Sequence, residues 1–269
     1  MNKDYKAFFS LSGPAFGRQI PTHHLYRHGQ LDELQQFLSS ALDQGAIALL
    51  TGPVGAGKST ALRAFLAGLD SARCAVLYVG FTTIDRALFR EMAQKLGLPP
   101  AHLKGDLIVQ IHTAVEHLWM SKSRQTLLVV DDAHLLPDSL LTEIRQLLNF
   151  EMDSAAPLGL FLVGKPALRA RLREAQHEEL YQRAPIRYSL AGLSRAETAE
   201  YIAAHMAAVG GDPAVFTEDA VDLVYQQSKG IPREINNLCV YALITAAWQD
   251  TRLIDRKVID DVIRAQGAV

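Results

Sequence analysis

The segment 46–60 constrains the fold more than any other part of the sequence. It reads AIALLTGPVGAGKST, in which an apolar run leads directly into Gly52-x-x-x-x-Gly57-Lys58-Ser59. A run of this kind before such glycines is typical of a buried strand, a tight loop and the start of a helix. Glycines allow the loop to curl so that successive backbone N–H groups point inward and form a nest for anions. The segment therefore predicts a phosphate-binding loop within an α/β fold.

Each side chain at the end of this loop has an expected role. Lys58 is expected to reach the β- and γ-phosphates of ATP, and the Ser59 hydroxyl to ligate Mg²⁺. The following helix, predicted through Leu69, adds the positive end of its dipole to the same site. The alternative is a glycine-rich turn without a ligand. The predicted nucleotide-binding residues of this segment are Gly52, Pro53, Val54, Gly55, Ala56, Gly57, Lys58, Ser59 and Thr60.

The composition is that of an ordinary globular protein. The chain has 269 residues, 49% of them hydrophobic and 21% charged, which is enough for a large core in one or two domains. The net charge of −2 favours neither a nucleic-acid binder nor a membrane-surface protein, so any basic patch must be local. Cys74 and Cys239 lie in apolar stretches without metal-ligand spacing, which indicates buried thiols. Without a signal-peptide core or a run of transmembrane length, we expect a cytoplasmic protein with no membrane partner.

Short apolar runs alternate with amphipathic segments up to residue 190, a pattern typical of a parallel sheet covered on both faces. The expected strands are 46–51, 75–80, 126–131, 158–164 and 186–190. The expected helices between them are 30–44, 58–69, 84–96, 106–121, 138–149 and 166–175. Four helices are expected beyond the last strand, at 195–208, 217–228, 232–248 and 255–265. The predicted domains are an N-terminal extension with a first helix packed on the core (1–45), an α/β nucleotide-binding core (46–192) and a helical lid (193–269).

Two carboxylates, Asp131 and Asp132, follow the apolar run 127–130. The carboxyl ends of parallel strands open onto the ligand crevice, where a carboxylate can hold Mg²⁺ directly or through water. We assign Asp131 to the metal and Asp132 to the attacking water, a position at which many such ATPases carry glutamate. Because aspartate is one methylene shorter, and a misplacement of about 1 Å can cost on the order of a hundredfold in rate, hydrolysis is expected to be slow. A strand-end turn without a catalytic role is the alternative.

Three arginines are candidates for the phosphate site. Arg233 lies at the start of a predicted lid helix, in GIPREINN, where it can face the γ-phosphate. Arg183 precedes the last strand and is expected to act on the nucleotide of a neighbouring subunit, a role that is worth roughly 10³–10⁵ in rate where it occurs. Arg187 competes for this role. Pairing with a surface carboxylate is the alternative for each.

With these motifs the chain resembles an AAA+ ATPase of the ExeA/GspA type, a group that also includes the TniB- and TnsC-like ATPases of transposons. The motifs that carry the resemblance are Tyr5-x-x-Phe8-Phe9-x-Leu11-x-x-x-x-Phe16, Leu25-Tyr26, the phosphate-binding loop, 129–136 (VVDDAHLL), Leu162-Val163-Gly164-Lys165-Pro166-x-Leu168, Gln182-Arg183 and Gly230-x-Pro232-Arg233-x-Ile235-Asn236. The resemblance implies a P-loop core with a five-stranded parallel sheet of order 5-1-4-3-2, a helical lid, and ATP held between subunits of a ring or filament.

The sequence departs from this family at two positions. Asp132 replaces the usual glutamate, and Lys165 replaces a neutral polar residue at the end of the fourth strand. We place Lys165 with Asp132 and Arg183 among the candidate catalytic residues, because a lysine there can contact phosphate as a second cation. The alternative is that its side chain points away.

The resemblance leaves the biological role open between two classes. Because the chain stops soon after the lid motif, we expect a stand-alone regulator of DNA transposition, an ATPase that marks duplex DNA and recruits or activates a transposase or adaptor. The alternative is a cytoplasmic ATPase that assists an envelope secretion apparatus through protein partners. A nucleotide-gated switch with negligible turnover is a third possibility. The candidate DNA contacts are Arg86, Arg90 and Lys104, for which a solvated helix face is an equal alternative.

Overall fold

The computed structural model describes residues 4–17, 25–80, 85–150 and 155–267. By its internal contacts the chain divides into two compact units. The α/β unit contains the described residues of Gly29–Val54 and Lys58–Leu190. The helical unit contains those of Met1–His28, Gly55–Gly57 and Ala191–Val269.

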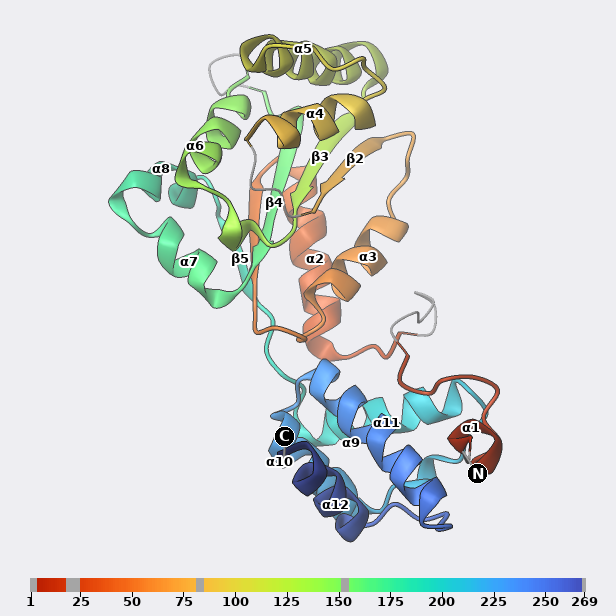
Figure 1. Ribbon diagram of the computed structural model, residues 1–269. Helices are drawn as coiled ribbons and strands as arrows, with labels where there is room; N and C mark the ends of the chain where they lie inside the picture. Colours follow the sequence, from red (N-terminus) through yellow and green to blue (C-terminus); the bar gives the residue numbers. More distant parts are fainter. Residues whose placement is uncertain (1–3, 18–24, 81–84, 151–154, 268–269) are drawn as a thin grey trace. The chain divides into compact units, whose positions relative to one another are not determined.

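The α/β unit alternates strands with helices, as its sequence predicts (Figure 1). Its strands are β1 (Ile47–Thr51), β2 (Cys74–Val79), β3 (Gln125–Val130), β4 (Leu158–Gly164) and β5 (Ile186–Ser189). Its helices and 3₁₀ turns are α2 (Gly29–Asp43), α3 (Lys58–Ala67), α4 (Asp85–Lys95), α5 (Lys104–Lys122), η2 (Ala133–Leu135), α6 (Asp138–Leu147), α7 (Pro166–Leu172), η4 (Ala175–His177) and α8 (Glu178–Gln182). The strands pair in parallel in the order β2-β3-β4-β1-β5, which confirms the predicted order read from the opposite edge.

Burial along the strands follows the order of the sheet. All residues of the central strands β1 and β4 are buried, and so is β3 after its first residue. The edge strand β5 alternates between half-buried and exposed residues, and β2 at the other edge exposes Tyr78. Continuous apolar runs in the central strands are what helices on both faces of a parallel sheet require.

Different helices cover the two faces of the sheet. Leu160 and Leu162 of β4 belong to one core cluster with side chains from α4, α5, α6, α7 and α8. Phe161, which lies between them and points to the other face, contacts Phe65 of α3 with ring centroids 5.8 Å apart. Gln35 of α2 donates from Nε2 to the carbonyl oxygen of Ala61 in α3 at 3.1 Å, so α2 and α3 lie together on that face.

The helical unit consists of short and long helices around its own core cluster. Its elements are α1 (Tyr5–Phe8), α9 (Arg195–Ala207), η5 (Pro213–Val215), α10 (Glu218–Ser228), α11 (Pro232–Trp248) and α12 (Arg256–Gly267). Ser194 and Glu197 form the reciprocal capping box at the start of α9, with bonds of 3.2 and 2.8 Å. Among the described residues, the helices lack the combination of length and apolar character that crossing a membrane requires.

The N-terminal segment contributes to the core of the helical unit. Phe9, Leu11 and Phe16 are buried in its cluster, and the Phe16 ring stacks on the imidazole of His205 with centroids 5.4 Å apart. This differs from the predicted arrangement, in which all of 1–45 packs on the α/β core. Of the described residues in this range, those from Gly29 onward, including α2, belong to the α/β unit, and those before Gly29 belong to the helical unit. Apolar side chains in 5–16 indicate burial, but the sequence does not specify which surface they cover.

Candidate nucleotide-binding site

The phosphate-binding loop lies between β1 and α3, as predicted. Gly55 and Gly57 have φ angles of +85° and +96°, a region that favours glycine. At Gly52 a Cβ atom would lie 2.5 Å from the carbonyl oxygen of Leu190, so a side chain is excluded there. Lys58 Nζ donates to the carbonyl oxygens of Gly52 and Pro53, each at 2.8 Å, which holds the ammonium group over the loop.

Ser59 at the start of α3 and Asp131 after β3 are in direct contact. Ser59 Oγ donates to Asp131 Oδ2 at 2.9 Å, and Tyr78 Oη of β2 donates to the same oxygen at 2.8 Å. The backbone N–H of Asp132 donates to Asp131 Oδ1 at 2.9 Å. Hydroxyl and carboxylate oxygens are the ligands that Mg²⁺ prefers, and an ammonium group nearby suits a phosphate chain. The donor set therefore fits magnesium and a nucleoside triphosphate.

Tyr78 is a residue of the site that our sequence analysis did not identify. It is the last but one residue of β2 and pairs in register with Val129 of β3, two residues before Asp131. Although Tyr78 is 39% exposed, the partial burial of its phenol, and then the hydrogen bond to Asp131, raise its pKa, so it remains a donor at neutral pH. The sequence feature that could have identified Tyr78 is its position: it is a polar residue at the carboxyl end of the strand next to β3, where ligands bind in such sheets.

Asp132 carries its carboxylate on a strained backbone. Its φ angle is +52°, in the left-handed region that aspartate tolerates better than most residues. The side chain is 56% exposed and, within the described part of the chain, accepts no hydrogen bond. The basic group beside it is His134 of η2, whose Nδ1 lies 3.9 Å from Asp132 Oδ1.

His134 is the buried histidine of this site. Its side chain is 8% exposed, and among the described residues neither ring nitrogen has a hydrogen-bond partner. An unpartnered buried polar group costs about 1–3 kcal/mol. Burial lowers the pKa of His134; the Asp132 charge opposes this shift, and the Lys165 and Lys58 charges add to it. The net effect favours the neutral form of the imidazole.

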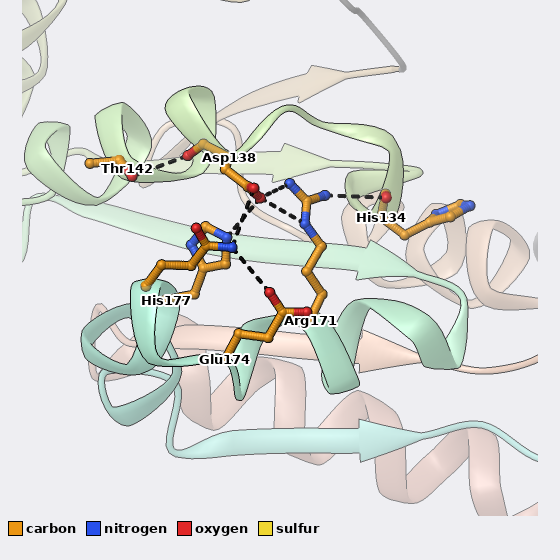
Figure 2. A network of polar contacts seen from close by, with 7 residues as sticks. His134, Asp138, Thr142, Arg171, Glu174 and His177 are labelled. Atoms are coloured by element: carbon orange, nitrogen blue, oxygen red, sulfur yellow. Dashed lines mark hydrogen bonds and ion pairs between the residues drawn. The ribbon is translucent and has the colours of Figure 1, made fainter.

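A polar network anchors the loop that carries His134 (Figure 2). Arg171 of α7 donates from NH1 to the carbonyl oxygen of His134 at 3.3 Å and from Nε to Asp138 Oδ1 at 2.9 Å. His177 Nε2 lies 2.8 Å from the same Asp138 oxygen. The hydrogen bonds from Arg171, and then from His177, lower the pKa of Asp138.

The other predicted site residues lie in three places. Lys165 is the N-cap residue of α7, directly after β4, with an exposed side chain. Thr60 is exposed on α3, next to Ser59. Arg233 is the exposed second residue of α11 in the helical unit. The start of α11 is fixed by close backbone contacts: Leu193 N donates to the Gly230 carbonyl oxygen at 2.8 Å, and a Cβ atom on Gly230 would lie 1.9 Å from the Leu193 oxygen.

Arg183 and Arg187 flank the start of β5 and both have partners within the α/β unit. Arg183 NH2 lies 3.7 Å from Glu179 Oε1, and Glu179 is also paired with Arg145 of α6. Arg187 places its guanidinium 3.8 Å from the centroid of the Tyr181 ring and donates to the Tyr181 carbonyl oxygen at 2.7 Å.

The three candidate DNA contacts lie on two helices, α4 and α5. Arg86 and Arg90 are exposed and lie one turn apart on α4. Lys104, at the start of α5, is ion-paired with Glu143 of α6 at 2.5 Å. The role of these residues stays a prediction.

The sheet order, the loop between β1 and α3, and the carboxylate after β3 define the fold of the P-loop AAA ATPases. In agreement, residues 41–172 match the family described as "AAA domain". General secretion pathway protein A of Aeromonas hydrophila is 32% identical over 246 residues. The alignment covers 90% of this chain but 45% of that protein, so the chain spans less than half the length of this relative.

Solved structures share the fold at low sequence identity. Cdc6p from Pyrobaculum aerophilum has a TM-score of 0.66 at 20% identity, covering 89% of this chain and 67% of that chain. The ORC1 protein of Aeropyrum pernix, solved in complex with DNA, has a TM-score of 0.68 at 17% identity, with coverages of 94% and 68%. The RuvB Holliday junction branch migration motor of Thermotoga maritima has a TM-score of 0.55 at 18% identity, with coverages of 88% and 69%.

Proposed function

We propose that this protein is an ExeA/GspA-type ATPase that binds and hydrolyses Mg²⁺-ATP and works through protein partners of a secretion apparatus. The observation that carries the nucleotide chemistry is the 2.9 Å contact between Ser59 Oγ and Asp131 Oδ2, beside the Lys58 ammonium group. The similarity to general secretion pathway protein A favours the secretion role, which our sequence analysis gave as the alternative to DNA transposition. A location in the cytoplasm stays a prediction.

The residues of the α/β unit divide the chemistry between them. The backbone N–H groups of the P-loop and Lys58 bind the phosphates of ATP. Ser59 and Asp131 would hold Mg²⁺, which neutralises developing phosphate charge when bound. Asp132 polarises the attacking water, and Lys165 contacts the γ-phosphate from the end of β4. Tyr78 orients the Asp131 carboxylate through its hydroxyl group.

Two arginines complete the proposed site. Arg233 contacts the γ-phosphate from the start of α11. Arg183 acts on the nucleotide of a neighbouring copy, so that full activity requires a ring or filament of this chain. We assign this role to Arg183 because it lies in the Gln182-Arg183 motif that carries the family resemblance, and Arg187 remains the competing candidate.

The role in DNA transposition, with duplex DNA and a transposase or adaptor as partners, has weaker support. The net charge is −2, and of the candidate DNA contacts Lys104 is already paired with Glu143. The ORC1 structure contains DNA, but at 17% sequence identity its similarity to this chain concerns the fold alone. Protein partners are therefore the better proposal.

Steady-state hydrolysis by the purified protein tests both parts of the proposal. We expect slow, Mg²⁺-dependent release of phosphate from ATP, absent in Lys58→Ala, with no change on addition of duplex DNA. The matched control is Lys122→Ala, an exposed lysine at the end of α5. No hydrolysis by the wild type would overturn the ATPase assignment. Strong stimulation by duplex DNA would instead favour the transposition role.

A further inference from the structure

The imidazole of His134 is buried among the groups of the nucleotide site. The hydrogen bond from Arg171 to its carbonyl oxygen holds its backbone. The ring itself points away from the Asp138 network, beyond the ends of the strands (Figure 2). At the end of β4, a Cβ atom on Gly164 would lie 3.3 Å from His134 Nδ1, so glycine leaves the space that the ring occupies. The ring is thus fixed against the sheet, with Nδ1 toward Asp132.

We propose that His134 is a positioning residue for ATP hydrolysis: its Nδ1–H donates a hydrogen bond to the Asp132 carboxylate and holds that carboxylate toward the attacking water. The inference rests on the proposed ATPase function. It assigns a partner to a buried imidazole that has none among the described side chains. It also gives the exposed Asp132 carboxylate a hydrogen-bond donor that fixes its position.

Geometry and charge both suit this hydrogen bond. The 3.9 Å between His134 Nδ1 and Asp132 Oδ1 is about 1 Å longer than a hydrogen bond, and the Asp132 side chain is 56% exposed. The charged groups that face the ring are Asp132, Asp131, Lys165 and Lys58. Burial, and then the Lys165 and Lys58 charges, favour the neutral imidazole by lowering its pKa. A neutral imidazole with its proton on Nδ1 is a donor toward Asp132.

The short side chain of Asp132 explains why a hydrogen bond that fixes its carboxylate would increase the rate. A glutamate would extend one methylene further from the backbone, whereas Asp132 must be directed from a left-handed residue with an unrestrained side chain. A displacement of about 1 Å in such a group can lower the rate on the order of a hundredfold. Asp131 does not need such a contact, because three hydrogen-bond donors already orient its carboxylate.

Three substitutions of His134 separate this role from simple packing. His134→Leu removes both nitrogens, His134→Asn keeps a donor near the position of Nδ1, and His134→Gln moves the donor toward the position of Nε2. We expect His134→Leu and His134→Gln to lower kcat by about 10–100-fold with ATP affinity unchanged, and His134→Asn to retain most of kcat. His117→Asn, on the exposed side of α5, is the matched control.

A double-mutant cycle with Asp132→Asn tests whether His134 acts through that carboxylate. If it does, adding His134→Leu to Asp132→Asn lowers kcat little further, because the group it positions is already lost. Multiplicative losses would overturn the inference, as would equal rates in the Asn, Gln and Leu variants of His134. If His134→Leu fails to fold, the Asn and Gln pair still decides. If the wild type hydrolyses ATP but the variants give either contradicting result, the inference about His134 is wrong and the proposed ATPase function stands. If the wild type is inactive, both the proposed function and the inference are wrong.

Discussion

The carboxylate of Asp138, the first residue of α6, accepts hydrogen bonds from the Arg171 guanidinium of α7 (Figure 2). The same oxygen lies 2.8 Å from Nε2 of His177, whose side chain is 2% exposed. Because Arg171 also holds the carbonyl oxygen of His134, this carboxylate ties α6 and α7 to the loop that follows Asp131 and Asp132. The network is therefore structural support for the candidate site.

The first prediction is that Asp138→Asn lowers Tm at pH 7 by a few degrees. The pKa of Asp138 is lower in the folded chain, so its contribution is fully present above the unfolded pKa of about 3.9. It is lost as the pH falls through the folded pKa. Thermal unfolding from pH 3 to 8 should therefore show a constant difference from wild type above about pH 5 that shrinks below about pH 4. Asp43→Asn, at the exposed end of α2, is the control; a difference independent of pH would contradict the ion-pair explanation.

The second prediction is that Lys58→Ala abolishes ATP binding while leaving the fold intact. The substitution removes the cation expected to face the β- and γ-phosphates, and the carbonyl oxygens of Gly52 and Pro53 that it contacts remain accessible to water. Isothermal titration with ATP, together with far-UV circular dichroism, measures both effects. Undiminished ATP affinity in a folded variant would contradict the assignment of the P-loop.

The third prediction concerns the hydroxyl group of Tyr78. Tyr78→Phe removes one of the three donors to Asp131 but keeps the ring on β2. We expect the Mg²⁺ concentration for half-maximal hydrolysis to rise about tenfold, because groups that orient a metal ligand typically have effects of this order. A Mg²⁺ titration at saturating ATP measures it. Tyr241→Phe, an exposed tyrosine on α11, is the control; an unchanged Mg²⁺ requirement in Tyr78→Phe would mean that Asp131 is held without it.

Local signals in the sequence predicted most of the α/β unit. The glycines of 52–57 and the apolar runs before them specify a strand, a loop and a helix within one short segment, and Asp131 ends another run. The boundaries of all five strands agree with the structure to within one residue at each end. The short helices α1 and α8 were missed because they span only one turn or slightly more and carry no amphipathic period.

Long-range contacts account for what the sequence did not reveal. Tyr78 reaches Asp131 only because β2 and β3 are neighbours in register, a fact about sheet order and not about the residues near Tyr78. The packing of Phe16 on His205 joins residues 189 positions apart. In the same way, the ion pair of Lys104 with Glu143 depends on how α5 and α6 pack, so the exposure of this lysine was not predictable.

The fourth prediction concerns the length of the side chain at position 132. Asp132→Asn should bind ATP normally but hydrolyse it more slowly, because it keeps the left-handed backbone and loses the carboxylate. Asp132→Glu should raise kcat, since the carboxylate reaches further, and should lower Tm slightly because glutamate tolerates a φ of +52° less well. Single-turnover hydrolysis and thermal unfolding measure the two effects. Rates unchanged by both substitutions would place the activation of water elsewhere.

The last prediction is that Arg183 acts across a subunit boundary. Arg183→Ala should bind ATP but hydrolyse it poorly, because the neighbouring site loses a cation that is worth roughly 10³–10⁵ in rate where such arginines act. Lys58→Ala is expected to be inactive because it does not bind ATP, but it keeps Arg183. At a mixed interface it can therefore supply Arg183 to the ATP bound by an Arg183→Ala subunit. Mixing the two should restore part of the activity at mixed interfaces, and restoration should increase with protein concentration because it requires association. Arg187→Ala serves as the comparison: its contacts with Tyr181 predict a lower Tm with hydrolysis per folded subunit preserved. Normal hydrolysis by Arg183→Ala together with complementation by Arg187→Ala would transfer the role to Arg187, and no recovery in either mixture would show that these arginines act within their own subunit.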